Sequence, residues 1–332
     1  FSPGFTQRDL SVIRHVSKED GLSCSAITSI AQDHQGFLWV GTHSGLNPYD
    51  GHSIKVYRNN PNDSTSLCDN SITCLFVNRL GELWIGTTNN GLSIYDFRND
   101  RFDNFNWGVH PNSLSGNRVT SIEEDDQGNM WVSTLMGLNR YQRESKTFKR
   151  FLSSATVTAK PHLADSLKKA GCPSYLLGHF LKFRNKTVSD EEFFYDIPLT
   201  PSTRRWISKL QELLSIKLYG TGVRTMEVDH KNVWIGLDNG GLAKLDTEKG
   251  SFHTYSDKIS HKILSLLNDN EFLWIGTMDG GVKRFWKKRS EVTDFPETAN
   301  VKFIKSLYKD SIGNILAGDE DGLSLLDRRQ NR

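Results

Sequence analysis

The sequence predicts an all-β protein, a β-propeller of four-stranded blades, and three observations carry the prediction. A segment anchored on tryptophan recurs through most of the chain. Its period is 40 to 47 residues, with one longer interval. Every copy divides into short apolar or alternating runs separated by glycine and polar turns. Four short strands in a period of this length are typical of one propeller blade.

The repeat is clearest in residues 37–51, FLWVGTHSGLNPYDG, and in residues 82–96, ELWIGTTNNGLSIYD. Tryptophan occupies the anchor position in five copies and isoleucine in the sixth: Trp39, Trp84, Trp131, Trp234, Trp274 and Ile315. Successive anchors lie 45, 47, 103, 40 and 41 residues apart. The interval of 103 residues therefore marks an insertion between the third and fourth copies.

The first copy gives the order of the elements in one blade. An apolar run at 26–33 predicts the first strand, and the polar DHQG turn leads to a second strand at 37–42. HSG turns the chain into a third strand at 45–50, and the fourth follows at 54–60. The later copies repeat this order, so we expect one blade per copy.

The residue types at fixed positions agree with blade packing. A tryptophan on the second strand can bury on the order of 150 to 250 Å² between adjacent sheets. A small residue such as Gly41 follows two positions later, as a packed wedge of large and small side chains requires. A tight hairpin needs positive φ, which glycine adopts without a Cβ clash. All six copies supply that glycine: Gly45, Gly91, Gly137, Gly241, Gly281 and Gly322.

The two ends of the chain predict how the ring closes. The sixth copy has no fourth strand, and a spare strand, SVIRHV at 11–16, precedes the first copy. Pairing this strand with the last sheet would remove an open sheet edge. We therefore expect three blades and the closing strand in residues 1–152, and three blades in residues 221–332.

Residues 153–220 form the insertion and carry helix signals. Thr200 and Pro201 suit a helix cap and first turn, and the apolar residues of 206–218 recur at helical spacing up to Gly220. We expect a small helical insertion. A degenerate seventh blade is the alternative, so the ring has six or seven blades at this point.

Composition limits the function. Hydrophobic residues make up 36% and charged residues 24% of the chain, enough for a packed core. A net charge of +2 gives no electrostatic reason to expect nucleic acid as a partner. No apolar run reaches the roughly 18 residues of a membrane span. Cys68 and Cys74 suit either a short-range disulfide or two idle buried thiols, and the thiols are favoured.

No pattern of catalytic chemistry stands out. The ten histidines are scattered and form no metal-ligand spacing with cysteine or carboxylate, so we expect no metal and no cofactor. A D-x-x-G-x-x-W pattern at Asp33, Gly36 and Trp39 is similar to the Asp-box turn of sialidase-type propellers, which is a structural turn. We therefore expect a protein that is not an enzyme.

The repeats resemble the two-component regulator propeller repeat. The resemblance lies in the string D-x-x-G-x-[LM]-W-[IV]-G-T-x-x-G-L-x-x-Y-D, in the linkers NPNDSTSLCDNSIT (60–73) and HPNSLSGNRVT (110–120), and in the opening RHVSKEDGLS. It covers residues 11–152 and 221–327. The helical insertion and the six copies depart from the family's pattern, in which rings of seven blades come in pairs.

The resemblance implies a function. In the family, such propellers form the periplasmic sensor of hybrid two-component systems and detect glycan fragments. A transmembrane helix, a histidine kinase, a receiver and a DNA-binding domain follow in the same polypeptide, outside this chain. The expected partner is therefore a small-molecule ligand, an oligosaccharide. A homodimer is a further expectation, in which the ring or the insertion docks a second copy of the chain.

Ligand contacts are expected at the hairpins after the second strands and at the starts of the inner strands. Their Asn, Asp and Arg side chains can bond sugar hydroxyls and uronates, and tryptophan can stack on a sugar face. The candidates are His43, Asn70, Asn89, Asn90, Trp107, Asn117, Arg118, Trp206, Asp238, Asp279 and Asp319. Two alternatives stay open: a protein-interaction or dimerisation scaffold, and a carbohydrate hydrolase or lyase.

Overall fold

The computed structural model describes most of the chain. It covers residues 16–108, 110, 112–151, 153–158, 187–189, 215–220, 222–238, 241–255, 258–259, 261–295, 298, 301–310, 313–320 and 322–326. In these ranges the protein is an all-β propeller of six blades, as the sequence predicts, and the described part contains no helix.

Each blade is an antiparallel sheet whose strands follow one another in sequence. The ring strands are β1 (Ile27–Gln32), β2 (Leu38–Thr42) and β3 (Gly45–Tyr49); β4 (Ile72–Val77), β5 (Leu83–Thr87), β6 (Leu92–Asp96) and β7 (Arg101–Phe105); β8 (Val119–Glu124), β9 (Met130–Thr134), β10 (Gly137–Gln142) and β11 (Thr147–Phe151); β15 (Val223–Asp229), β16 (Asn232–Leu237), β17 (Leu242–Asp246) and β18 (Ser251–Thr254); β19 (Ile263–Asp269), β20 (Phe272–Thr277), β21 (Val282–Trp286) and β22 (Glu291–Asp294); and β23 (Ser306–Lys309), β24 (Ile315–Gly318) and β25 (Leu323–Leu326).

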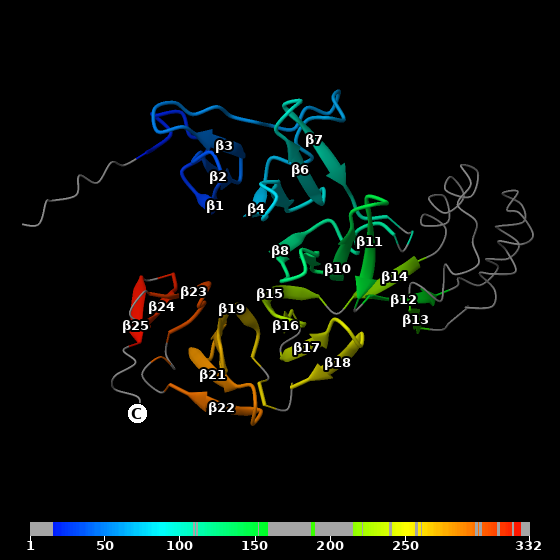
Figure 1. The fold of residues 1–332 in the computed structure, drawn as a ribbon, viewed down its shortest axis with the longest axis vertical. Helices are drawn as coiled ribbons and strands as arrows, with labels where there is room; N and C mark the ends of the chain where they lie inside the picture. Colours follow the sequence, from blue (N-terminus) through cyan, green and yellow to red (C-terminus); the bar gives the residue numbers. More distant parts are fainter. Residues whose placement is uncertain are drawn as a thin grey trace, which may run out of the picture.

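The blades stand side by side around a central axis. The first strand of each blade is innermost, and β1, β4, β8, β15, β19 and β23 touch their neighbours in that order (Figure 1). In blade 1 the fourth strand is reduced to two isolated bridges, Leu46 with Tyr57 and Tyr49 with Ile54. The six repeats of the sequence are therefore the six blades.

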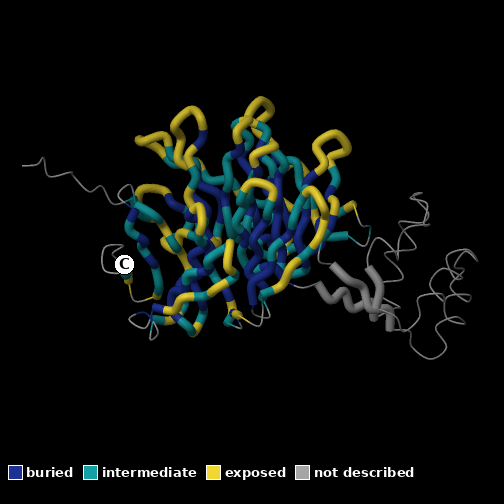
Figure 2. Tube along the Cα trace, turned by 60° about the horizontal axis from the view of Figure 1, so that its bottom comes forward, coloured by how far each residue is buried: buried dark blue, intermediate teal, exposed yellow. Residues whose placement is uncertain are grey.

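The anchor tryptophans form the core between blades. Trp39 packs against the apolar side chains of blade 2, and Trp84 and Trp131 pack in the same way against the blades that follow them. Trp234 and Trp274 continue the series. The buried residues accordingly concentrate in the strands and the exposed residues in the turns (Figure 2). The predicted wedge packing is confirmed.

The D-x-x-G turn has a structural role. The carboxylate of Asp33 accepts the indole N–H of Trp39 at 2.8 Å, and Asp125 accepts that of Trp131 at 2.9 Å. The other oxygen of each carboxylate accepts backbone amides of the turn, such as that of Phe37 at 3.0 Å. Each aspartate thus satisfies a buried polar group that would otherwise be costly.

The first and last blades expose apolar side chains. Cross-strand partners share a sheet face, and Ile30 of β1 and Leu38 of β2 lie on the face opposite to Trp39. Tyr308 and Leu325 lie in the same way on the outer face of blade 6, where they are 66% and 62% exposed. The closing strand expected at 11–16 falls almost wholly outside the described residues, so it stays a prediction.

The insertion contains a small sheet of its own. Its strands are β12 (Ser153–Thr158), β13 (Thr187–Ser189) and β14 (Ser215–Gly220), in the order β13-β12-β14. This sheet lies outside the ring, because β8 of blade 3 contacts β15 of blade 4 directly (Figure 1). The helices expected between 159 and 214 lie outside the described residues, and Leu218, the end of the expected helical stripe, lies in β14.

Two local expectations can be compared with the structure. The six hairpin glycines all have positive φ, as expected. Cys68 and Cys74 are free, and burial raises the pKa of the Cys74 thiol to about 12. Both cysteines are therefore inert thiols rather than a disulfide in this structure.

Candidate functional site

The candidate site lies at a β-bulge that recurs at the same position of the inner strands. The pairing between the first and second strands skips one residue near the start of the inner strand in blades 1 to 5. The skipped residues are Thr28, Thr73, Thr120, Arg224 and Leu264. A bulge leaves one residue outside the ladder and re-aims its side chain, and bulges recur next to functional sites.

These residues line a central funnel. The bulged residues and Lys305 of blade 6 surround a cavity of about 380 Å³ on the axis of the ring. Each of the six blades therefore contributes the equivalent residue. The mouth of the cavity adds residues from the hairpins and from the segments just before the inner strands: His43, Thr88, Arg118, Leu135, Met278 and Phe303.

The funnel is basic. Its lining contains Arg118, Arg224 and Lys305 but no aspartate or glutamate among the described residues. Arg224 donates to Asp238 at the rim, and the Lys305 ammonium lies 2.7 Å from Glu320. The guanidinium of Arg118 pairs with no carboxylate of the described residues. Arg118 is therefore the cation most available to an anionic ligand.

Neutral polar groups complete the lining. Thr28 belongs to the lining, but its hydroxyl oxygen is buried and has no hydrogen-bond partner among the described residues. The imidazole of His43 bonds the hydroxyl of Ser71 at 3.3 Å, and Ser71 bonds Thr88 at 2.9 Å. Cations, hydroxyls and apolar side chains together suit a small polar anion with several hydroxyl groups.

Some candidates from the sequence lie at this funnel. His43 and Arg118 line it directly. Asp238 lies at its rim through the ion pair with Arg224. Asp279, next to the lining residue Met278, is exposed.

The side chains of three other candidates are hydrogen-bonded to backbone groups. Asn70 accepts the amide of Asn59 at 2.8 Å, and Asn117 accepts the amide of Trp107 at 2.7 Å. The side chain of Asn90 donates to the carbonyl of Cys68 at 3.0 Å. These side chains brace the connections that enter the inner strands.

The last four candidates neither line the funnel nor bond the inner connections through their side chains in the described structure. The backbone amide of Asn89 donates to Asp69 at 2.9 Å, and Asp319 accepts the amide of Gly322 in its own hairpin at 2.8 Å. Trp107 bridges to Leu114 and is half-buried. Trp206 lies outside the described residues.

Sequence reasoning missed Arg224, Lys305 and the threonines of blades 1 to 3. A signal was present in the sequence, because the residue after an equivalent Ile or Val reads Thr, Thr, Thr, Arg, Leu and Lys through the six copies. A single strand does not reveal the bulge, which appears only in the pairing with the next strand. The described residues also contain no cluster of three metal-ligating side chains.

The family comparison matches three segments of the chain. Residues 21–44, 66–89 and 113–135 match the sequence profile of the two-component regulator propeller. Three segments of the chain are therefore similar to the repeat of that family. A stretch of 56 residues is 55% identical to histidine kinase P4 of Formosa agariphila, covering 17% of this chain and 4% of that protein.

Solved structures show the same fold. The extracellular domain of a putative hybrid two-component system of B. thetaiotaomicron is similar with a TM-score of 0.66 and 22% identity, over 96% of this chain and 36% of that one. Virginiamycin B lyase of Staphylococcus aureus is similar with a TM-score of 0.57 and 12% identity, over 91% and 81% of the two chains. At these identities the likeness establishes the propeller fold alone.

The described residues hold no helix that meets the length and hydropathy needed to cross a bilayer.

Proposed function

For a chain built on two-component regulator propeller repeats, we propose the role of a sensor domain that binds an anionic oligosaccharide in its central funnel. The repeat family and the propeller fold support a sensor region of a hybrid two-component receptor. We place it in the periplasm, with a histidine kinase elsewhere in the same polypeptide. The chain spans 36% of the length of the similar extracellular domain. The kinase and the periplasmic location are therefore proposed for this chain.

The observation that carries the proposal is the Arg118 guanidinium in a lining without carboxylates. Guanidinium groups bind carboxylates through two parallel hydrogen bonds, and this geometry favours a uronate over a neutral sugar. The imidazole of His43, which lines the funnel, supplies a hydrogen-bond partner for sugar hydroxyls. A cavity of about 380 Å³ has room for one or two sugar units.

A thermal-shift screen against neutral oligosaccharides and oligouronates tests the proposal. A ligand at 100 times its dissociation constant stabilises the folded state by about 2.7 kcal/mol, which corresponds to a rise of several degrees. We expect oligouronates to raise the melting temperature and Arg118→Ala to remove that rise.

The matched control is Arg98→Ala. Arg98 is exposed in the turn after β6, at the end of the blade away from the funnel. This variant should respond to oligouronates as the wild type does. An equal response from Arg118→Ala, with an unchanged melting temperature in the absence of ligand, would contradict the proposal.

A further inference from the structure

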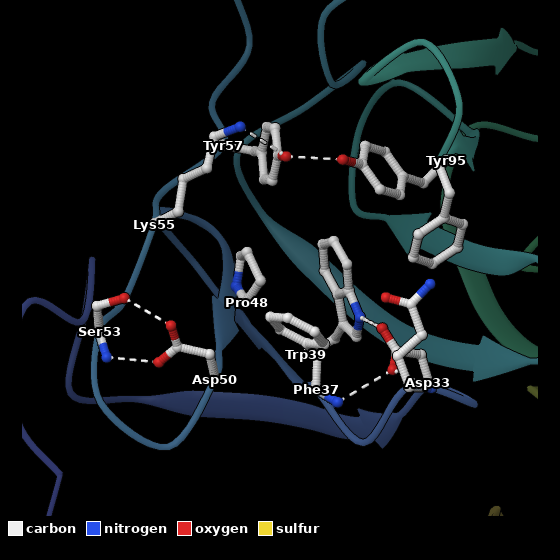
Figure 3. Close-up of a pocket in the computed structure, with 11 residues that line it drawn as sticks. Asp33, Phe37, Trp39, Pro48, Asp50, Ser53, Lys55, Tyr57 and Tyr95 are labelled. Atoms are coloured by element: carbon white, nitrogen blue, oxygen red, sulfur yellow. Dashed lines mark hydrogen bonds between the residues drawn. The ribbon is translucent and has the colours of Figure 1, made fainter.

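A second cavity lies at the far end of blade 1 from the funnel. It has a volume of about 240 Å³ and opens beside the turn between β1 and β2 (Figure 3). Its walls are mainly aromatic: Phe37, Trp39, Tyr57, Tyr95 and Phe97. Phe37 and Phe97 are 38% and 39% exposed, so two apolar rings at this cavity are accessible to solvent.

One residue of the repeat explains the cavity. Trp39 of β2 pairs with Pro48 of β3, and such cross-strand partners share a sheet face. In blades 3, 4 and 5 the residue opposite the tryptophan is a long cation: Arg140, Lys244 and Arg284. Their charged groups lie 6.0, 5.6 and 5.7 Å from the centres of the tryptophan rings.

Blades 1 and 2 lack that cation. Blade 2 places Ile94 opposite Trp84, and blade 1 places the short ring of Pro48 opposite Trp39. Both Pro48 and Trp39 line the cavity. The cavity of blade 1 is therefore the space that a built-in arginine or lysine fills in three other blades.

Two carboxylates belong to the lining of this cavity. Asp33 holds the indole of Trp39 from within the wall, and Asp50 lies on the other side of Pro48 (Figure 3). Backbone amides of Ser53 and His52 bond Asp50 and hold its pKa at about 2, so it is charged at neutral pH. The one cation in the lining, Lys55, lies 2.8 Å from Asp100. Lys55 also lies over the Tyr57 ring, 4.1 Å from its centre, so the exposed charge on the Trp39 side of the cavity is that of Asp50.

The aromatic wall is held in place before any ligand arrives. The hydroxyls of Tyr57 and Tyr95 lie 2.7 Å apart, and the Tyr95 hydroxyl donates to Asp100 at 2.6 Å. The Trp39 and Tyr57 rings stack with centres 6.2 Å apart. A preorganised wall lowers the ordering cost of binding.

We propose that this cavity binds a basic side chain, arginine or lysine, from a partner polypeptide. The incoming cation takes the place beside Trp39 that Arg140, Lys244 and Arg284 take beside their own tryptophans. The apolar stem of the side chain packs between Phe37 and Phe97, and Asp50 faces the charge. This binding is separate from the function of the funnel, which lies at the other end of the blade.

A titration with N-acetyl-arginine amide tests the charge requirement. The matched ligand is N-acetyl-citrulline amide, which has nearly the same shape and no charge. Binding is followed by NMR through the indole N–H signals. We expect arginine to bind in the millimolar range and on the order of tenfold more tightly than citrulline. Equal affinities, or no binding of either ligand, would contradict the proposal.

Two variants test the location. Pro48→Arg supplies the cation that blades 3 and 5 carry, so it should fill the cavity, keep the fold and abolish arginine binding. Phe37→Ala should weaken binding severalfold. Leu80→Ala is its control, because Leu80 is 68% exposed in the corresponding turn of blade 2.

The outcomes separate this site from the funnel. Pro48→Arg should leave the thermal shift with oligouronates unchanged, since Pro48 does not line the funnel. Arginine binding that survives in a folded Pro48→Arg protein would overturn the assignment to this cavity.

Discussion

The replacement Glu123→Gln should remove much of the pH dependence of stability. Glu123 lies on β8 opposite Trp131, on the face that packs against blade 4. Burial, with the nearby charge of Glu227 as a second cause, raises the pKa of Glu123 to about 8. Burial also raises the pKa of Glu227 to about 7. Blades 1, 2 and 5 carry apolar residues at this position, Ala31, Phe76 and Leu267, whereas blade 4 carries Glu227.

Because the pKa of Glu123 is raised in the folded state, the free energy of unfolding falls as the pH rises. The unfolded chain ionises at its ordinary pKa of 4.5, while the folded protein keeps its proton on Glu123 up to about pH 8. The contribution of protonated Glu123 to the free energy of unfolding is therefore fully present below pH 4.5 and is lost as the pH rises to 8. Each pH unit corresponds to about 1.4 kcal/mol, which sets an upper limit of about 5 kcal/mol. Glu123 keeps some contact with solvent, so we expect about 2 to 4 kcal/mol.

Urea unfolding at pH 5 and pH 8.5 measures this effect. Wild-type protein should lose stability between the two values, and Glu123→Gln should lose about 2 to 4 kcal/mol less, because glutamine does not ionise. Glu144→Gln, at an exposed carboxylate two strands away, should follow the wild type. If Glu123→Gln and the wild type lose the same stability between pH 5 and pH 8.5, the burial argument is wrong.

Three further predictions concern the blades. Trp131→Ala should destabilise the protein by about 3 to 5 kcal/mol in urea unfolding, because the ring is fully buried between blades, whereas the half-buried Trp107→Ala should cost clearly less. Gly91→Ala should lower the free energy of unfolding by several kcal/mol more than Gly36→Ala. Both glycines have positive φ. A Cβ at Gly91 would lie 2.2 Å from the carbonyl oxygen of Phe105, whereas a Cβ at Gly36 would meet nothing within 4 Å. Leu325→Ser should change the free energy of unfolding by no more than about 0.5 kcal/mol, since this side chain is 62% exposed; a larger loss would mean that another segment covers this face in solution.

The repeat allowed the architecture to be predicted from sequence. A tryptophan followed by glycine at a fixed interval depends on local packing and hairpin geometry, and both are visible in one strand. Trp39 and Gly45 therefore took the roles expected of them. The bulge at Thr28 could not be foreseen in this way, because a skipped residue is a property of two paired strands.

The candidate site was anticipated only in part. Arg118 and His43 reach the funnel, but Arg224 was not predicted, because it lies in the equivalent bulge of blade 4. Asn70 and Asn117 had the right chemistry and the right strand ends, yet their carbonyls bond amides of the preceding connection. The cavity at Pro48 required a comparison of cross-strand partners between blades, which only the pairing supplies.

One titration tests the central claim, that the funnel senses an anion through its cations. Calorimetry would compare an oligouronate with its neutral methyl ester, which keeps the sugar hydroxyls and removes the charge. The account predicts that the acid binds, that rising salt weakens it, and that the ester binds at least tenfold more weakly. An ester that binds as well as the acid would contradict a site organised around Arg118.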